Sequence, residues 1–323
     1  MQSNINNLKL QKHTTPKLGK NGFIKNIKKN RTLLLMISPA IVYYVIFMYL
    51  PMLGICIAFQ NFNYVKGVFG SPLVGFENFR FFFITGDARN VTFNTFAYNA
   101  VFVSVNTIFE ITIAIFLSEL SGKYYKKATQ TIMFLPYFIS WVVVGAFIYN
   151  IFNYEFGSLN TFLKSLNMKP VNVYINESVW KYILLLANMW KWVGYGSVIY
   201  LSGIMGIDNE MFEAAFIDGA NIFQKIRYIT LPSLTPQIVV LTLMNIGQIF
   251  RGDFEMFYQV TGNNPMVYKA TDVIDTYVFR ALINSQEFGM SSAVGLYQSV
   301  LCFIIIMVTN YIVKKYHSDY ALF

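Results

Sequence analysis

Hydrophobic positions along this chain gather into six long runs that are separated by shorter polar segments. The runs cover residues 33–58, 96–120, 129–152, 179–205, 234–259 and 292–313. Each run is at least about as long as the 20 residues that a helix needs to cross the hydrocarbon core of a bilayer. The first and last runs are the clearest, and the fifth is the weakest, because Arg251, Asp253 and Glu255 interrupt its outer end. The pattern predicts an all-α protein with six transmembrane helices.

Composition supports a membrane protein rather than a soluble one. Of 323 residues, 55% are hydrophobic and 13% are charged, and the charged share is about half of that in soluble domains. Residues 1–32 form a tail with eight Lys or Arg and no acid. We therefore expect a basic tail over residues 1–32 and one transmembrane domain over residues 33–323.

The distribution of basic residues predicts which side each connection faces, because Lys and Arg are retained on the cytoplasmic side. Apart from the tail, they cluster after the second, fourth and sixth runs, at Lys123, Lys126, Lys127, Lys225, Arg227, Lys314 and Lys315. Six spans with both termini in the cytoplasm satisfy this pattern. The net charge of +9 largely reflects this asymmetry and needs no nucleic-acid partner.

The remaining segments form outer connections over residues 59–95, 153–178 and 260–291, the first with a short interfacial helix at about 77–84. Cys56 and Cys302 lie within the predicted spans, so neither a disulfide framework nor a cysteine metal site is expected. His13 and His317 lie outside the spans. We expect no metal site and no cofactor.

The connection over residues 206–232 is the most informative segment. Asp208 or Asn209 can cap a short helix, and Gly219 lies where that helix can end in a tight turn. A second, basic helix follows, and Pro232 allows the next span to start. The expected result is a compact helical elbow with small side chains, which another protein surface can approach closely.

This segment resembles the EAA loop of ATP-binding-cassette importer permeases, which reads Glu-Ala-Ala, three residues, Gly, nine residues, Ile-x-Leu-Pro. The matching positions are Glu213, Ala214, Ala215, Gly219, Ile229, Leu231 and Pro232, and Asp218 resembles the carbohydrate-importer branch. Ile226 departs from that branch, which often has Phe there. The resemblance implies that the loop docks on an ATPase subunit and transmits its closure to the spans. ATP hydrolysis would then belong to separate subunits, and the chain has no GxxxxGK[ST] phosphate loop of its own.

Other segments resemble LplB-type polysaccharide permeases, which are relatives of MalF. They are residues 49–54, 58–60, 75–79, 254–260 and 272–280. The resemblance implies a bacterial plasma-membrane location, an oligosaccharide substrate, a second MalG-like permease, a pair of ATPase subunits and an extracellular solute-binding lipoprotein. Because the EAA loop is shared across importers, a non-sugar solute stays open as an alternative.

A sugar site needs aromatic faces together with amides and carboxylates for hydroxyl groups. The candidate substrate-binding residues on the fourth and fifth runs are Trp190, Gly194, Tyr195, Ser197, Asn245, Gln248, Arg251 and Asp253. Of these, Gly194, Ser197 and Asp253 align near positions that contact maltose in MalF. Arg251 could pair with the carboxylate of a uronate.

Each candidate also has a structural interpretation. Trp190 could belong to an interfacial aromatic belt, Asn245 and Gln248 could bond between helices, and Arg251 could pair with Asp253. Glu110, Lys181 and Lys191 are expected to be structural or to extend toward the membrane surface.

Other classes of protein fit less well. A membrane-embedded enzyme would need a converging Ser/His/Asp set, an HExxH motif or paired intramembrane acids, and both histidines lie outside the spans. An ion channel or secondary transporter would not explain the EAA-like loop. We therefore expect a transport subunit and not an enzyme.

Overall fold

The computed structural model describes residues 30–84 and 86–316, and its regular elements there are helices, with one isolated antiparallel bridge between Gln60 and Leu73. The predicted all-α class is confirmed. Most of the basic tail lies outside the described residues, as does His317.

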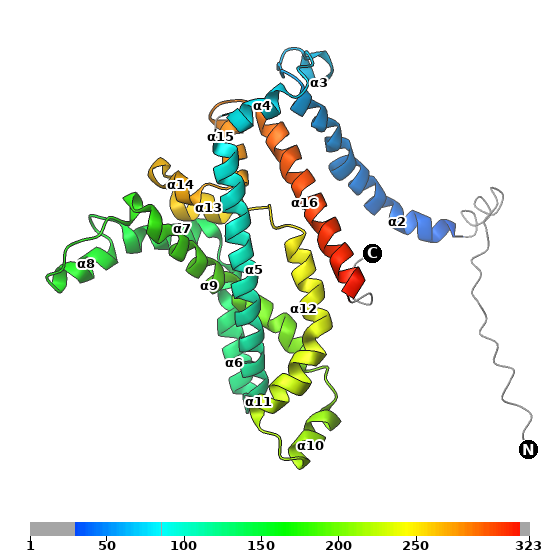
Figure 1. Ribbon diagram of the computed structural model, residues 1–323, viewed down its shortest axis with the longest axis vertical. Coiled ribbons are helices and arrows are strands. Elements are labelled where there is room, and N and C mark those ends of the chain that lie inside the picture. Colours follow the sequence, from blue (N-terminus) through cyan, green and yellow to red (C-terminus); the bar gives the residue numbers. More distant parts are fainter. Residues whose placement is uncertain (1–29, 85, 317–323) are drawn as a thin grey trace, which may run out of the picture. The chain divides into compact units, whose positions relative to one another are not determined.

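The helices run in the following order, where η marks a 3₁₀ or π segment (Figure 1). They are α2 (Arg31–Tyr44), η1 (Val45–Tyr49), η2 (Leu50–Phe59), α3 (Gly67–Gly70), α4 (Glu77–Ile84), α5 (Asp87–Glu119), α6 (Lys123–Phe134), η3 (Leu135–Phe138), α7 (Trp141–Phe152), α8 (Ser158–Ser165), η4 (Val173–Ile175), α9 (Glu177–Ile204), α10 (Asn209–Ile217), α11 (Ile222–Lys225), η5 (Ile226–Thr230), α12 (Leu231–Ile246), α13 (Phe254–Thr261), η6 (Pro265–Val267), α14 (Tyr268–Thr271), α15 (Ile274–Ile283) and α16 (Phe288–Tyr316).

The chain divides into two compact units, residues 1–54 and residues 55–323. In the first unit, α2 and η1 are apolar and contain no buried residue. The apolar helical run Arg31–Phe59 is long enough to cross a bilayer. A helix that exposes apolar side chains on every face is typical of contact with lipid.

In the second unit, α5 and α9 lie side by side (Figure 1), and they form the most extensive contact between any two helices of the described chain. One apolar cluster joins α7, α9 and α13 around Trp180 and Phe257. A second joins α4, α5, α15 and α16 around Phe82. A third joins α5, α9 and α12 around Leu117 and Tyr200, so that these three helices form the frame around which the others pack.

Four helical runs of the described chain are long and apolar enough to cross a membrane, and a bent pair makes up to five. The four are Arg31–Phe59, Asp87–Glu119, Ile222–Ile246 and Phe288–Lys315. The expectation of several apolar membrane-spanning helices is therefore confirmed, and the third, fourth and fifth runs differ from the uninterrupted apolar helices that hydropathy predicts. The short helix expected at about 77–84 is confirmed as α4.

The third run is not one straight helix, because it bends by 92° between η3 and α7. Pro136 lies in η3, and Ser140 caps α7 with its hydroxyl, which accepts the amide of Val143. The ammonium of Lys191 donates to the carbonyl of Ile139, which the bend leaves without a helical partner. Lys191 is buried, so it stabilises the bend and does not extend toward the membrane surface.

The fifth run is also broken, since α12 ends at Ile246 and α13 begins only at Phe254. At its N-terminal end, the helix of the fifth run begins earlier than the expected residue 234. The helix is continuous from Ile222 to Ile246, so Pro232 does not start a separate span. Proline's ring would collide with the carbonyl four residues earlier, and the wider π-helical turn of η5 directly before it relieves this collision.

The helices of the second and fourth runs differ from those that hydropathy predicts. In both, polar side chains form hydrogen bonds with other parts of the protein rather than with water. The second begins at Asp87 instead of residue 96, since Asn90 and Asn94 donate to the carbonyl of Lys269. The fourth, α9, is as long as expected but falls outside the apolar set. Several of its polar side chains are buried, among them Asn188, Lys191 and Ser197.

Candidate functional site

A cavity of about 560 Å³, lined by both polar and apolar groups, lies between α5, α9, α12 and the break that follows α12. Amide side chains are its most frequent polar groups, joined by two acids, one arginine and several aromatic rings. Its lining residues are Asn99, Phe102, Val103, Asn106, Thr107, Glu110, Asn188, Trp192, Tyr195, Gly196, Ile199, Tyr200, Leu241, Met244, Asn245, Gln248, Arg251, Gly252 and Asp253.

One wall of the cavity is the non-helical segment 247–253, whose backbone groups bond to side chains of other helices. The Nδ2 of Asn99 lies 2.9 Å from the carbonyl oxygens of both Ile249 and Arg251. The Nε2 of Gln298 donates to the carbonyl of Phe250 at 2.8 Å. Irregular backbone within a membrane-spanning run is tolerated where it faces a cavity and its polar groups are satisfied. The break is thus held open by α5 and α16.

Asp275, which lies outside the spans, also stabilises the non-helical segment 247–253. Its Oδ2 accepts the amide of Gly252 at 2.6 Å and the side chain of Gln298 at 2.9 Å. Burial raises the pKa of Asp275, and these two hydrogen bonds oppose that rise. The carboxyl group therefore fixes where Gly252 and its neighbour Arg251 lie on the cavity wall.

Asp253 sits at the end of the break, where it caps α13. Its Oδ1 accepts the amide of Met256 at 3.1 Å, and its Oδ2 accepts the indole Nε1 of Trp141 at 2.9 Å. The ammonium of Lys191 lies 4.7 Å from the centre of the Trp141 ring. Asp253, Trp141 and Lys191 therefore connect the two broken runs to each other.

Arg251 does not pair with Asp253, although sequence proximity suggested that it could. Between described residues, the side-chain ion pair within 4.0 Å is that of Arg280 with Asp272. Arg251 is exposed on the cavity wall. Its guanidinium group is thus a cation available to a ligand in the cavity.

The candidate residues of the fourth run separate into two groups. Tyr195 lines the cavity, and its ring stacks on Tyr137 with centroids 4.5 Å apart. Trp190 lies instead among apolar side chains of α7 and α9, away from the cavity. Neither Gly194 nor Ser197 lines it; Ser197 is buried and bonds to the carbonyl of Gly194.

Gly194 has a packing role, since a Cβ there would lie 1.8 Å from the carbonyl oxygen of Met133. The absence of a side chain lets the end of α6 cross α9 at this point. Of the eight candidates, the structure brings five together around the cavity, and these are Tyr195, Asn245, Gln248, Arg251 and Asp253.

The polar face of α5 was not singled out by sequence reasoning, which interpreted Glu110 as structural. Asn99, Asn106 and Glu110 are spaced by seven and four residues, so that they share one helical face. All three line the cavity. That spacing of polar residues on an otherwise apolar run is the signal that could have identified them.

The EAA-like loop, residues 206–232, forms a helical elbow with well-defined caps. Asp208 caps α10 by accepting the amide of Glu210 at 3.0 Å. Gly219 has a φ of +73° and ends α10, while the amide of Ala220 bonds to the carbonyl of Ala215 at 2.9 Å. This arrangement is a Schellman turn, which favours glycine because other residues are strained at positive φ. The predicted helix cap and glycine turn are confirmed.

The second half of the elbow starts with a capping box. The side-chain oxygens of Asn221 and Gln224 each accept a hydrogen bond from the backbone N–H of the other residue. A small hollow of about 350 Å³ lies between the two halves. Ala214, Ala215, Asp218 and Ile229 are among its lining residues, Glu213 is exposed nearby, and Leu231 and Pro232 lie in the first turn of α12.

The elbow also exposes large apolar side chains. Phe216 and Ile217 at the end of α10 are 75% and 84% exposed, and Phe223 of α11 is 78% exposed. Contiguous exposed apolar groups of this kind mark protein interaction sites.

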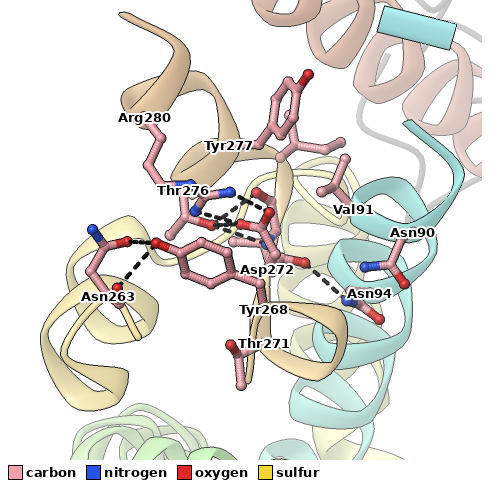
Figure 2. A network of polar contacts seen from close by, with 12 residues as sticks. Asn90, Val91, Asn94, Asn263, Tyr268, Thr271, Asp272, Thr276, Tyr277 and Arg280 are labelled. Atoms are coloured by element: carbon pink, nitrogen blue, oxygen red, sulfur yellow. Dashed lines mark hydrogen bonds and ion pairs between the residues drawn. The ribbon is translucent and has the colours of Figure 1, made fainter. Parts of the chain in front are cut away.

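A network of polar contacts fixes the connection between α13 and α16 (Figure 2). The two terminal nitrogens of Arg280, Nη1 and Nη2, donate to the carboxylate of Asp272, and the hydroxyl of Thr276 donates to the same carboxylate. The Arg280 guanidinium lies 4.0 Å from the ring centre of Tyr268. The side chain of Asn94 donates to the carbonyl of Asp272 at 3.0 Å, which joins this network to α5.

Comparisons with known proteins agree with this geometry. A family model described as "binding-protein-dependent transport system inner membrane component" matches residues 110–318. The protein LplB of Bacillus subtilis is 31% identical over 297 residues, which cover 91% of this chain and 92% of that protein. The polygalacturonan/rhamnogalacturonan transport system permease protein YteP of the same organism is 31% identical over 291 residues, 90% of each chain.

A solved structure extends the comparison. It is the crystal structure of a bacterial ABC transporter involved in the import of the acidic polysaccharide alginate. It matches with a TM-score of 0.82 and 29% sequence identity over 91% of this chain and 98% of that chain.

Proposed function

Because the chain belongs to the family of binding-protein-dependent transport system inner membrane components, we propose that it carries an oligosaccharide across the bacterial plasma membrane as a permease subunit of an ATP-binding-cassette importer. The resemblance to LplB-type and MalF-type permeases inferred from the sequence is confirmed. Members of this family are transport components, so the chain is not expected to carry out bond chemistry.

The observation that carries the proposal is the cavity at the break after α12, whose lining combines amide groups with aromatic rings. Amide groups such as Asn245 and Gln248 can exchange hydrogen bonds with sugar hydroxyls, and the rings of Trp192 and Tyr195 offer faces for stacking. The substrate-binding residues are accordingly Tyr195, Asn245, Gln248, Arg251 and Asp253.

The alternative, a non-sugar solute such as an amino acid or phosphate, fits the lining less well. Such a solute carries a fixed charge in a small volume, whereas this lining distributes several amides and aromatic rings over about 560 Å³. Binding assays on the cognate solute-binding lipoprotein separate the two, since high affinity for an amino acid or phosphate would contradict the sugar proposal.

The coupling role belongs to the EAA-like loop. Its exposed apolar groups and the acid at Glu213 would contact one subunit of an ATPase dimer, and Gly219 would keep the elbow rigid. ATP hydrolysis is placed on those separate subunits. A second, MalG-like permease and an extracellular solute-binding lipoprotein complete the transporter.

We place both termini in the cytoplasm and count α9 as a sixth span. Its 28 residues are about 42 Å long, which exceeds the hydrocarbon core. Its buried side chains Asn188 and Lys191 bond to α5, to α13 and to the bend before α7 rather than facing lipid, which supports a span shielded by its neighbours.

Cysteine labelling tests this topology. In a chain with Cys56 and Cys302 replaced by Ala, a cysteine at Ile222 should react only with membrane-permeant reagents in intact cells. Labelling by an impermeant reagent from outside would contradict this topology, because the loop could then not reach an ATPase in the cytoplasm.

The coupling role is tested by co-purification and import. Gly219→Val should disrupt import and weaken capture of the ATPase while the two permease subunits still assemble, and Glu213→Lys should do the same. Gly67→Val is the matched control, because Gly67 also has a positive φ and open space around it but lies outside the loop. Normal import by both loop variants would refute the coupling role.

A further inference from the structure

Glu110 lies on the cavity wall without a described partner for its carboxyl group. It is half-buried, and no hydrogen bond or ion pair joins it to any residue in the described part of the chain. An acid in a membrane-spanning helix is costly and usually faces an aqueous cavity or a specific partner. Here the carboxyl group borders the cavity, close to Tyr200 of the facing helix α9.

The facing helix leaves room for this carboxyl group. A Cβ at Gly196 of α9 would lie 2.1 Å from the Cδ of Glu110. Only glycine fits at this position while Glu110 keeps its orientation. The side chain of Glu110 on α5 therefore fits against Gly196 on α9 at the cavity wall.

One helical turn before Glu110, Asn106 presents a second acceptor. Its Nδ2 donates to the Oδ1 of Asn188 at 2.8 Å, which fixes how its amide is oriented. Its Oδ1 is buried and has no hydrogen-bond partner in the described protein. Leaving a buried acceptor unpaired costs about 1–3 kcal/mol, so this oxygen favours a donor supplied by a ligand or water.

Glu110 and Asn106 lie apart from Arg251. The segment of Arg251 is held by Asn99, eleven residues before Glu110 on α5, which corresponds to about 16 Å along the helix axis. The cavity therefore has a cation toward one end and two unpartnered acceptors toward the other.

We propose that Glu110 and Asn106 form a second specificity-determining wall, which accepts hydrogen bonds from the hydroxyl groups of an uncharged sugar unit. This inference rests on the proposed function of the cavity. In either protonation state the carboxyl group of Glu110 offers an oxygen that accepts a hydrogen bond from a hydroxyl group, and in its ionised form it accepts more strongly than a neutral amide does. The ionised form also repels a carboxylate on the ligand, so this end of the cavity selects against uronate units at a pH where Glu110 is ionised.

The test uses the whole transporter in proteoliposomes, with both permease subunits, the ATPase subunits and saturating solute-binding protein. The probes are galactotriose, which is uncharged, and trigalacturonate, which carries carboxylates. Glu110→Gln keeps the shape of the side chain and should reduce galactotriose import about tenfold relative to trigalacturonate import. Glu110→Asp, which retains the carboxylate, should recover part of the difference.

Glu119→Gln is the matched control, because Glu119 lies exposed at the end of the same helix and away from the cavity. It should leave both import rates unchanged. If the wild type imports both sugars and Glu110→Gln leaves the ratio of galactotriose import to trigalacturonate import unchanged, the role of Glu110 is overturned. The proposed function of the cavity is not affected by that result. A wild-type transporter that imports no oligosaccharide would overturn the proposed function, and this inference with it.

Discussion

The indole Nε1 of Trp141 donates to the Oδ2 of Asp253 at 2.9 Å, and this bond connects the bent third run to the broken fifth. Both residues lie where helical hydrogen bonding is interrupted. Trp141 is the first residue of α7, and Asp253 caps α13. The two breaks thus support each other across the wall of the cavity.

Trp141→Phe should lower the free energy of unfolding by about 1–3 kcal/mol, because it retains an aromatic ring but lacks the indole N–H, which leaves the Asp253 oxygen without this donor. Thermal unfolding of the detergent-solubilised chain measures the effect. Trp190→Phe is the control, since Trp190 is 47% exposed, and it should be close to neutral. Equal effects of the two substitutions would contradict the role assigned to the bond.

Gly194→Ala should destabilise the protein by at least about 1–3 kcal/mol, since the new Cβ would lie 1.8 Å from the Met133 carbonyl oxygen. Gly295→Ala, in the interior of α16, meets nothing within 4 Å. It should stabilise the protein by about 0.5–1 kcal/mol through helix propensity. The two melting temperatures should therefore move in opposite directions.

Asp272→Asn should destabilise the connection between α13 and α16 by about 3–5 kcal/mol, because it leaves the part-buried Arg280 guanidinium without its anion. Amide hydrogen exchange of residues 268–283 should rise together with the loss of thermal stability. Glu155→Gln, at an exposed acid, serves as control and should change stability by less than about 0.5 kcal/mol. Unchanged exchange in Asp272→Asn would show that the network of Figure 2 contributes little.

Arg251→Gln should impair import of trigalacturonate selectively, leaving subunit assembly and basal ATPase activity intact. The planar guanidinium group can bind a carboxylate through two hydrogen bonds, which an amide cannot reproduce. Asp253 forms no ion pair with Arg251 within 4.0 Å in the described chain, and its two oxygens bond instead to Trp141 and Met256. Unimpaired trigalacturonate import by the variant would leave Arg251 with a structural role only.

Hydropathy was sufficient to predict an all-α membrane protein and the approximate positions of its long helices. It failed at residues 139–140 and 247–253, because a run of apolar residues does not reveal where a helix bends or unwinds. Those breaks depend on distant side chains, since Lys191, Asn99 and Gln298 bond to the carbonyl groups that the breaks release.

Within the candidate site, local sequence was informative for the elbow and less so for the cavity. Asp208 and Gly219 act on their own helix, so that a few adjacent residues predict the turn. The cavity combines α5, α9 and α12, whose contacts are not local. Spacing on one helix could not distinguish Tyr195, which lines the cavity, from its neighbour Gly194, which packs against Met133.

The most direct test of the account is ATP-driven import of labelled galactotriose and trigalacturonate into proteoliposomes that contain the complete transporter. We predict saturable accumulation of at least one of them that requires ATP, the solute-binding protein and this chain. Gly219→Val should abolish it, whereas Gly67→Val should not. Accumulation that persists without ATP or without this chain, or that is unaffected by Gly219→Val, would contradict the account.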